Sequence, residues 1–314
     1  MADVLTEALN APAGRLAEVL LKKLGSGSDN EPEMLQRLDR LVDAPGRAGF
    51  LARIRLATEV SLLFDRAPIW TRRRIVPLFE WTSADAQAAW AARKYSGYIG
   101  SPELFSLTKR PFLEMFTRSD VAAEDLRTYA EWLVAIFIAN QEGSQYPLKA
   151  TEARSALRRA GDRILPSVGH RLAMEMEKAK QSEKALRWQS VVGPAFQAIW
   201  PLDIELQTSA STFKLTQILR AAGDAFPAAA DVIIPFIRPE DPKSHSTVFS
   251  IAEAPDSLYA SAPGKMLNLL SAVVGDAATG SVHSLGKALD RVSAHDSTLA
   301  GSAEFRKLRI RAAT

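Results

Sequence analysis

Few residues in this sequence have the types and the spacing of a known catalytic or ligand-binding motif. Gly275–Gly280 has the glycine spacing of a phosphate-binding loop, but Ser281 and Val282 stand where that loop requires Lys and Ser or Thr. Without the lysine the loop has no charge for the β- and γ-phosphates, and no strand is expected before it. We interpret this segment as a connection between two helices.

The histidines form no metal-ligand pattern. His295–Asp296 would suit a metal-dependent phosphohydrolase, but that chemistry requires further His and Asp ligands, and His283 is the only histidine nearby. Asp241–Lys243 matches half of a nuclease signature, which belongs on a strand and not in a proline-rich loop. We expect a polar turn at the first position, an ordinary loop at the second, and no catalytic role for His170 or His245.

An enzyme would therefore need a site built from acids on facing helices. The absence of cysteine excludes disulfides, thiolate zinc sites and cysteine nucleophiles. Acids that follow Trp200–Pro201 at an expected helix end more often cap the next helix. The acidic candidates are Glu175, Glu177, Asp203 and Glu205. We expect a non-enzymatic protein with no catalytic residue, no metal and no cofactor.

Two basic clusters are the strongest candidates for contacts with a partner. The first is Arg72, Arg73 and Arg74, of which at most two can share one face of a helix. One of the three is expected to pair with an acid, and the acids considered are Asp65, Glu80 and Asp85.

The second cluster lies near the C-terminus. It holds four bases and no acid, and the rest of the chain carries 35 basic against 36 acidic residues. The broad basic face of a nucleic-acid-binding protein is therefore missing. We expect both clusters to contact a protein partner, and nucleic acid is the alternative. The residues of the second cluster are Arg306, Lys307, Arg309 and Arg311.

The elements that must position these residues are helices throughout. Apolar residues recur at the three- and four-residue spacing of amphipathic helices, which predicts roughly fourteen helices of about 10–20 residues. Clear examples are 14–24, preceded by Pro12, and 50–64. The best strand candidate, Val232–Ile234, is followed by Pro235, which argues against a strand. The six tryptophans are expected to anchor core contacts.

The order of these elements fits a globular helical domain or a solenoid. Pro77 and Pro111 lie 34 residues apart in similar apolar clusters, which favours a repeat architecture. We predict an all-α fold, an irregular α-solenoid of stacked helix pairs like the HEAT and armadillo folds. Its expected halves are 1–145 and 146–314, with an irregular segment rich in Pro and Ser at 238–263.

Two apolar stretches carry a family resemblance. One runs from Ile69 to Trp81 and on to Trp90, and the other from Trp188 to Asp203, followed by Ile233–Phe236. Together they resemble the helical C-terminal region of bacterial sirtuin-like proteins linked to defence against phage. In that family a separate N-terminal domain hydrolyses NAD, and its glycine-rich loop and catalytic histidine environment have no counterpart here. The resemblance implies a region that senses a trigger or holds an assembly, within a larger protein or as a split subunit.

Composition and the N-terminal residues indicate where in the cell the protein is expected. The chain has 314 residues, of which 47% are hydrophobic, enough to bury a sizeable core. The N-terminal Met-Ala-Asp-Val lacks the pattern of a signal peptide, and no apolar run approaches the ~20 residues that a membrane span requires. We expect a cytoplasmic bacterial protein with no membrane contact.

Overall fold

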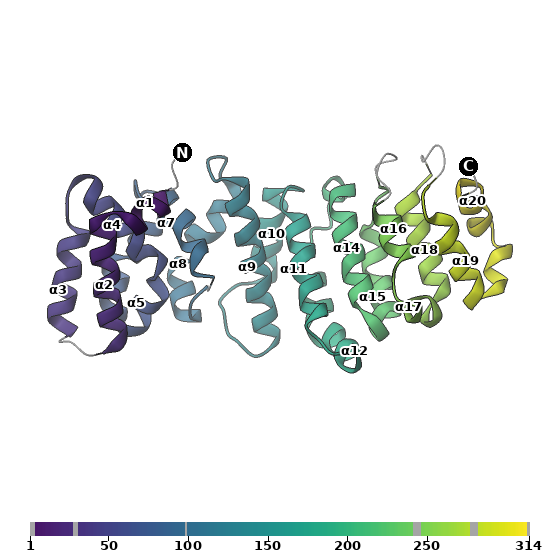
Figure 1. Cartoon of the computed structure of the whole chain (residues 1–314), viewed down its shortest axis with the longest axis horizontal. Helices are drawn as coiled ribbons and strands as arrows, with labels where there is room; N and C mark the ends of the chain where they lie inside the picture. Colours follow the sequence, from purple (N-terminus) through teal and green to yellow (C-terminus); the bar gives the residue numbers. More distant parts are fainter. Residues whose placement is uncertain (1–3, 28–30, 98, 241–245, 277–281, 313–314) are drawn as a thin grey trace. The chain divides into compact units, whose positions relative to one another are not determined.

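The computed structural model of the chain is built from helices (Figure 1). It describes residues 4–27, 31–97, 99–240, 246–276 and 282–312, and no strand occurs in these ranges. The prediction of an all-α fold is thereby confirmed. No described helix has both the length and the apolar character needed to cross a membrane.

The chain divides into two compact units. Unit 1 comprises Met1–Trp132 and Ser144–Leu148, and unit 2 comprises Leu133–Gly143 and Lys149–Thr314. Helix α9 (Ala123–Gln141) begins in unit 1 and ends in unit 2.

Unit 1 stacks its helices in two layers. In the first layer α2 packs on α4 and α4 on α7, and in the second α3 packs on α6, which is followed by η1 and α8. Helix α1 packs on the first layer, and α5 packs against α6. These elements are α1 (Val4–Asn10), α2 (Pro12–Ser26), α3 (Glu31–Val42), α4 (Gly46–Thr58), α5 (Val60–Arg66), α6 (Pro68–Arg74), η1 (Val76–Phe79), α7 (Ala86–Arg93) and α8 (Pro102–Glu114).

Unit 2 repeats this arrangement (Figure 1). One layer runs through α11, α14, α16 and α19, and the other through α10, α13, α15, α18 and α20, each helix packing on the next. The first layer is α11 (Leu165–Glu177), α14 (Ser209–Ala221), α16 (Ser246–Ala252) and α19 (Leu285–His295). The second is α10 (Ala150–Ala160), α13 (Gly193–Ile199), α15 (Phe226–Ile233), α18 (Pro263–Val274) and α20 (Ala303–Ala312). Each unit is therefore a solenoid-like stack of helix pairs.

Side-chain bonds join residues that lie about one helix pair apart in the sequence. In unit 1, Arg74 binds Asp43 over 31 residues and the Trp81 indole donates to the Pro111 carbonyl over 30. In unit 2, the separation is 34 residues for Lys287–Glu253, 34 for Lys265–Asp231 and 31 for Lys307–Asp276. These bonds tie each helix pair to the next pair of the same unit.

Aromatic side chains fill the core of unit 1. Trp90 meets Phe79 edge-on with ring centroids 4.9 Å apart, and Tyr129 at 5.3 Å. Four of the six tryptophans are buried, namely Trp70, Trp90, Trp188 and Trp200. Trp81 and Trp132 are half-buried. The predicted core role is confirmed for the four buried rings.

The predicted helix over 50–64 is wrong, because the structure contains two helices there. Helix α4 ends at Thr58 and α5 begins at Val60, with Glu59 between them outside the helical region of backbone angles. The Thr58 hydroxyl donates to the Arg55 carbonyl at 2.7 Å and accepts from the Arg55 guanidinium at 2.6 Å. Breaks of this kind explain why the helices are more numerous and shorter than expected.

The segment 238–263 is more regular than predicted. It contains α16 and also α17 (Asp256–Ser261). The Glu240 carboxylate accepts the Thr247 amide at 3.0 Å, which satisfies the start of α16. Pro255 precedes α17, and Pro263 is the first residue of α18, so these prolines mark helix starts. Asp241–Lys243, His245 and residues 277–281 of the glycine-spaced loop lie outside the described residues.

Candidate partner-binding groove

The short helix α6 carries the first basic cluster. Pro68 is its first residue, where the fixed φ of proline and its missing N–H cost nothing. Arg72 and Arg73 are exposed, whereas Arg74 forms an ion pair with Asp39 at 2.9 Å and a second with Asp43. The cluster is therefore divided into two outward-facing cations and one that holds α6 to α3.

The acids expected to pair with this cluster bind elsewhere, and that prediction is wrong. Glu80 pairs with Arg110, and Asp85 pairs with Arg53. Asp65 is exposed and forms no ion pair among the described residues. The physical reason is that α6 packs on α3, which brings the two acids at the end of α3 to Arg74.

A groove of about 410 Å³ lies between α3 and α6. Ile69 stands in its wall with 85% of its surface exposed, the most exposed large apolar residue in the described ranges. Trp70 is 5% exposed, and its indole N–H donates to Asp39 at 2.9 Å, so its orientation is fixed. The lining residues are Pro32, Leu35, Gln36, Asp39, Ala67, Pro68, Ile69, Trp70 and Arg73.

The groove carries an excess of positive charge, because the described acids around it are paired with arginines and some arginines have no acid partner among the described residues. Across α3, α6 and Asp43 the sequence has five arginines and four acids, and the three acids whose side chains the structure describes, Glu33, Asp39 and Asp43, are each paired with an arginine. Within the described part of the chain, Arg40, Arg72 and Arg73 have no ion-pair partner, and all three are exposed. An apolar cavity with unpaired guanidinium groups beside it suits a ligand that has both an apolar side chain and a negative charge.

The second basic cluster is mostly committed to bonds within the chain. On α20, Lys307 pairs with Asp276 and Arg309 pairs with Asp290. Arg311 donates to backbone carbonyls, including that of Asp276 at 2.6 Å. Arg306 is exposed and has no ion pair with any described residue. Three of the four side chains thus hold α20 to the preceding segment.

A second pocket, in unit 2, adjoins an ion-pair cluster that the sequence analysis missed. Glu175 on α11 is only 3% exposed, and its carboxylate lies 2.8 Å from Arg171, 2.7 Å from Lys178 and 2.8 Å from Arg187. Burial alone would raise the pKa of Glu175, but the bonds to Lys178 and the charge of Arg171 outweigh it and lower the pKa. The sequence spacing along α11 could indicate only the pairs of Glu175 with Arg171 and Lys178. Arg187 lies on a different helix, α12 (Lys184–Arg187), so its contact with Glu175 could not be predicted from that spacing.

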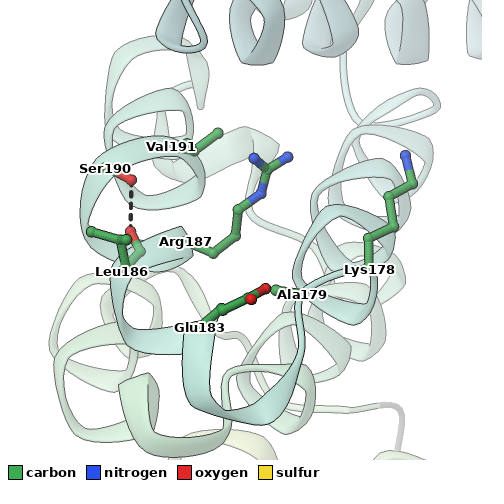
Figure 2. A pocket seen from close by; sticks show the side chains of 7 residues that line it. All are labelled: Lys178, Ala179, Glu183, Leu186, Arg187, Ser190 and Val191. Carbon is green, nitrogen blue, oxygen red and sulfur yellow. Dashed lines mark hydrogen bonds between the residues drawn. The ribbon is translucent and has the colours of Figure 1, made fainter.

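Figure 2 shows this pocket, which has a volume of about 410 Å³. Glu183 and Lys178 line it beside Arg187, and Leu186 is 67% exposed. The Ser190 hydroxyl, in the turn of π-helix at Trp188–Val192, donates to the carbonyl of Leu186 on α12 at 2.7 Å. The remaining lining residues are Ala179 and Val191. Because Glu175 pairs with Arg171, Lys178 and Arg187, the cations at this pocket already have a partner, and the groove of unit 1 is the better candidate for a negatively charged partner.

The acids considered for an enzyme site are not brought together as a metal site. Glu175 is bound by the three cations described above. Asp203 pairs with Arg158 at 2.7 Å and its side chain makes no capping hydrogen bond to the next helix, so its predicted capping role is wrong. Within the described ranges no three His, Cys, Asp or Glu side chains are placed to hold a metal ion. The predicted polar turn at His295–Asp296 is confirmed, because the Asp296 side chain accepts the Thr298 amide at 3.0 Å.

Comparison with known proteins adds one relative. Neither a protein-family model nor a solved structure matches this sequence. A protein of Sinorhizobium fredii, described as uncharacterized protein y4cA, is 24% identical over 314 residues, which cover 96% of this chain and 26% of that protein. The chain therefore spans about a quarter of the length of the relative that it matches.

Proposed function

We propose that this chain is a non-enzymatic helical scaffold or sensor that binds another protein, and that it serves in the bacterial cytoplasm as the regulatory region or split subunit of an anti-phage defence system. The observation that carries the proposal is the α3–α6 groove, where Ile69 is 85% exposed beside Arg72 and Arg73, which form no ion pair with any residue that the structure describes. Burial of such a side chain by a partner is worth about 2 kcal/mol, which makes its exposure costly without one.

The arrangement of the helices supports a scaffold role. Stacked helix pairs present extended surfaces and need no cofactor to do so. The longer relative supports a module that works beside other domains, because its aligned part is about a quarter of its length. The defence role rests on the resemblance of the apolar stretches described above.

The test is affinity capture from a bacterial lysate, with and without nuclease, before and after phage infection. We expect a stoichiometric protein that survives nuclease treatment and is lost with the double variant Arg72→Glu, Arg73→Glu. A sensor should capture this protein only after infection, and a scaffold in both conditions.

The matched control is Arg159→Glu on α10, which reverses an exposed arginine of unit 2 that has no ion pair among the described residues. It should leave the capture unchanged. Capture that disappears with nuclease would replace the proposal with nucleic-acid binding. If the groove variant Arg72→Glu, Arg73→Glu captured as much of the partner as the control variant, the partner would not bind at the groove.

A further inference from the structure

We infer that the α3–α6 groove binds an acidic peptide segment that carries a large apolar anchor residue. The inference deepens the proposed function, on which it rests, by giving the chemistry of the partner. It follows from three properties of the groove, namely the apolar wall, the distribution of paired and unpaired charges, and the fixed position of the indole ring.

The apolar wall defines the anchor. Pro32 and Leu35 from α3 face Ala67, Pro68 and Ile69 at the start of α6 across a cavity of about 410 Å³. That volume accommodates a side chain as large as Leu or Phe together with part of its backbone. Because Ile69 is 85% exposed, an anchor seated beside it would remove much of this surface from water.

The charges define the segment around the anchor. Arg73 lines the groove, Arg72 is its neighbour on α6, and Arg40 is exposed on α3, each without an ion pair in the described ranges. The carboxylate inside the groove, Asp39, already accepts the Trp70 indole and pairs with Arg74, so its charge is compensated. An incoming carboxylate therefore meets unpaired guanidinium groups, which form strong and often bidentate bonds with carboxylates.

The fixed indole favours a peptide over a nucleic acid. Proteins that bind single-stranded nucleic acid stack bases on exposed aromatic rings. Trp70 is 5% exposed, and its N–H is committed to Asp39 at 2.9 Å. The exposed large apolar side chain among the described residues of the groove lining is the aliphatic Ile69, which offers no stacking surface. A ligand with an aliphatic or aromatic anchor and flanking acids fits these properties best.

The experiment measures fluorescence anisotropy of a labelled ten-residue synthetic peptide with a central Leu-Phe pair flanked by Asp and Glu. The full chain is titrated at ~100 mM salt, where exposed charges still attract over about 10 Å. We expect saturable binding that weakens at least about tenfold with Arg72→Glu, Arg73→Glu and at least about tenfold with Ile69→Ser. Both sites are exposed, so circular dichroism should show unchanged helix content.

The matched control variants are Arg159→Glu, which changes an exposed arginine on α10, and Ile310→Ser, which changes an apolar residue on α20 that is 71% exposed. Neither should change the affinity. Two control peptides replace either the acids with Lys or the Leu-Phe pair with Ser, and each should bind at least about tenfold more weakly.

Four results would overturn the inference. They are no saturable binding, equal binding of either control peptide, equal weakening by the control variants, and tighter binding of a ten-nucleotide single-stranded DNA at the same residues. Failure of the peptide while Arg72→Glu, Arg73→Glu still abolishes protein capture would refute the partner chemistry and leave the proposed function standing. Peptide binding with capture that is unaffected by the variants would refute the proposed function instead.

Discussion

Replacement of Glu175 by Gln tests the largest electrostatic cluster of unit 2. The carboxylate is 3% exposed and bonds to three cations, so the variant leaves Arg171, Lys178 and Arg187 without their shared anion. Loss of one partner from a fully buried ion pair costs about 3–5 kcal/mol. The side chain of Lys178 is 56% exposed and regains water, so we expect a loss of about 3 kcal/mol in the free energy of unfolding.

Urea unfolding of the full chain, followed by circular dichroism, measures this loss. Glu177→Gln is the matched control, because Glu177 lies on the same helix two residues away and is exposed. It should change the free energy of unfolding by less than about 0.5 kcal/mol. Equal unfolding curves for Glu175→Gln and the wild type at pH 7 would refute the reasoning.

The pH dependence gives a second, independent check. The pKa of Glu175 is lowered from its ordinary value of 4.5, so its stabilising contribution is complete above that pH and is lost as the pH falls through the folded-state pKa. The difference between Glu175→Gln and the wild type should therefore shrink as the pH is lowered from 7 to below 4. A difference that stays constant over this range would show that the charge is not its cause.

Three further predictions concern other buried positions. Burial raises the pKa of Tyr259 from 10.0 to about 12, so the stabilising contribution of its neutral phenol is complete below pH 10 and is lost as the pH rises to 12. The wild type should therefore lose about 3 kcal/mol of unfolding free energy between these pH values that Tyr259→Phe does not lose, as measured by urea unfolding at each pH. A Cβ on Gly49 would lie 1.7 Å from the Ala44 carbonyl oxygen, so Gly49→Ala should lower the free energy of unfolding measured in urea by about 3 kcal/mol, whereas Gly264→Ala, whose Cβ would meet nothing within 4 Å, should not. Burial lowers the pKa of Arg93 to about 10, so burying its charge costs about 3 kcal/mol at pH 7. Arg93→Met should therefore keep the free energy of unfolding in urea within about 1 kcal/mol of the wild type, whereas Arg93→Ala should lower it by at least about 3 kcal/mol. Equal losses for the two variants would contradict this.

The sequence was sufficient for the fold class because helix signals are local. Pro12 at the first position of α2 and the apolar spacing that follows it act within one helix, and both are seen in the structure. The same local signals misled at 238–263. There the prolines, including Pro255 and Pro263, favour a prediction of irregular structure, although proline is also common in the first turn of a helix.

The candidate groove could be predicted only in part. Exposed arginines at positions 72 and 73 follow from the geometry of a short helix, but the partners of Arg74 are Asp39 on α3 and Asp43 just after it, 35 and 31 residues earlier in the chain. The exposure of Ile69 is also a tertiary property, because it depends on which face of α6 packs on α3. Side chains brought together by stacking leave no periodic signal in the sequence.

The side-chain bonds between successive helix pairs have a consequence for biosynthesis. Most of these bonds close a loop of between 30 and 46 residues, from Glu80–Arg110 to Gly100–Tyr146, so the second partner emerges from the ribosome shortly after the first. The entropy of loop closure rises with loop length, and it stays nearly the same for every such bond within a unit. We expect each helix pair to dock on the preceding one during translation, so that the nascent chain never has to wait for a distant segment before it buries its apolar faces.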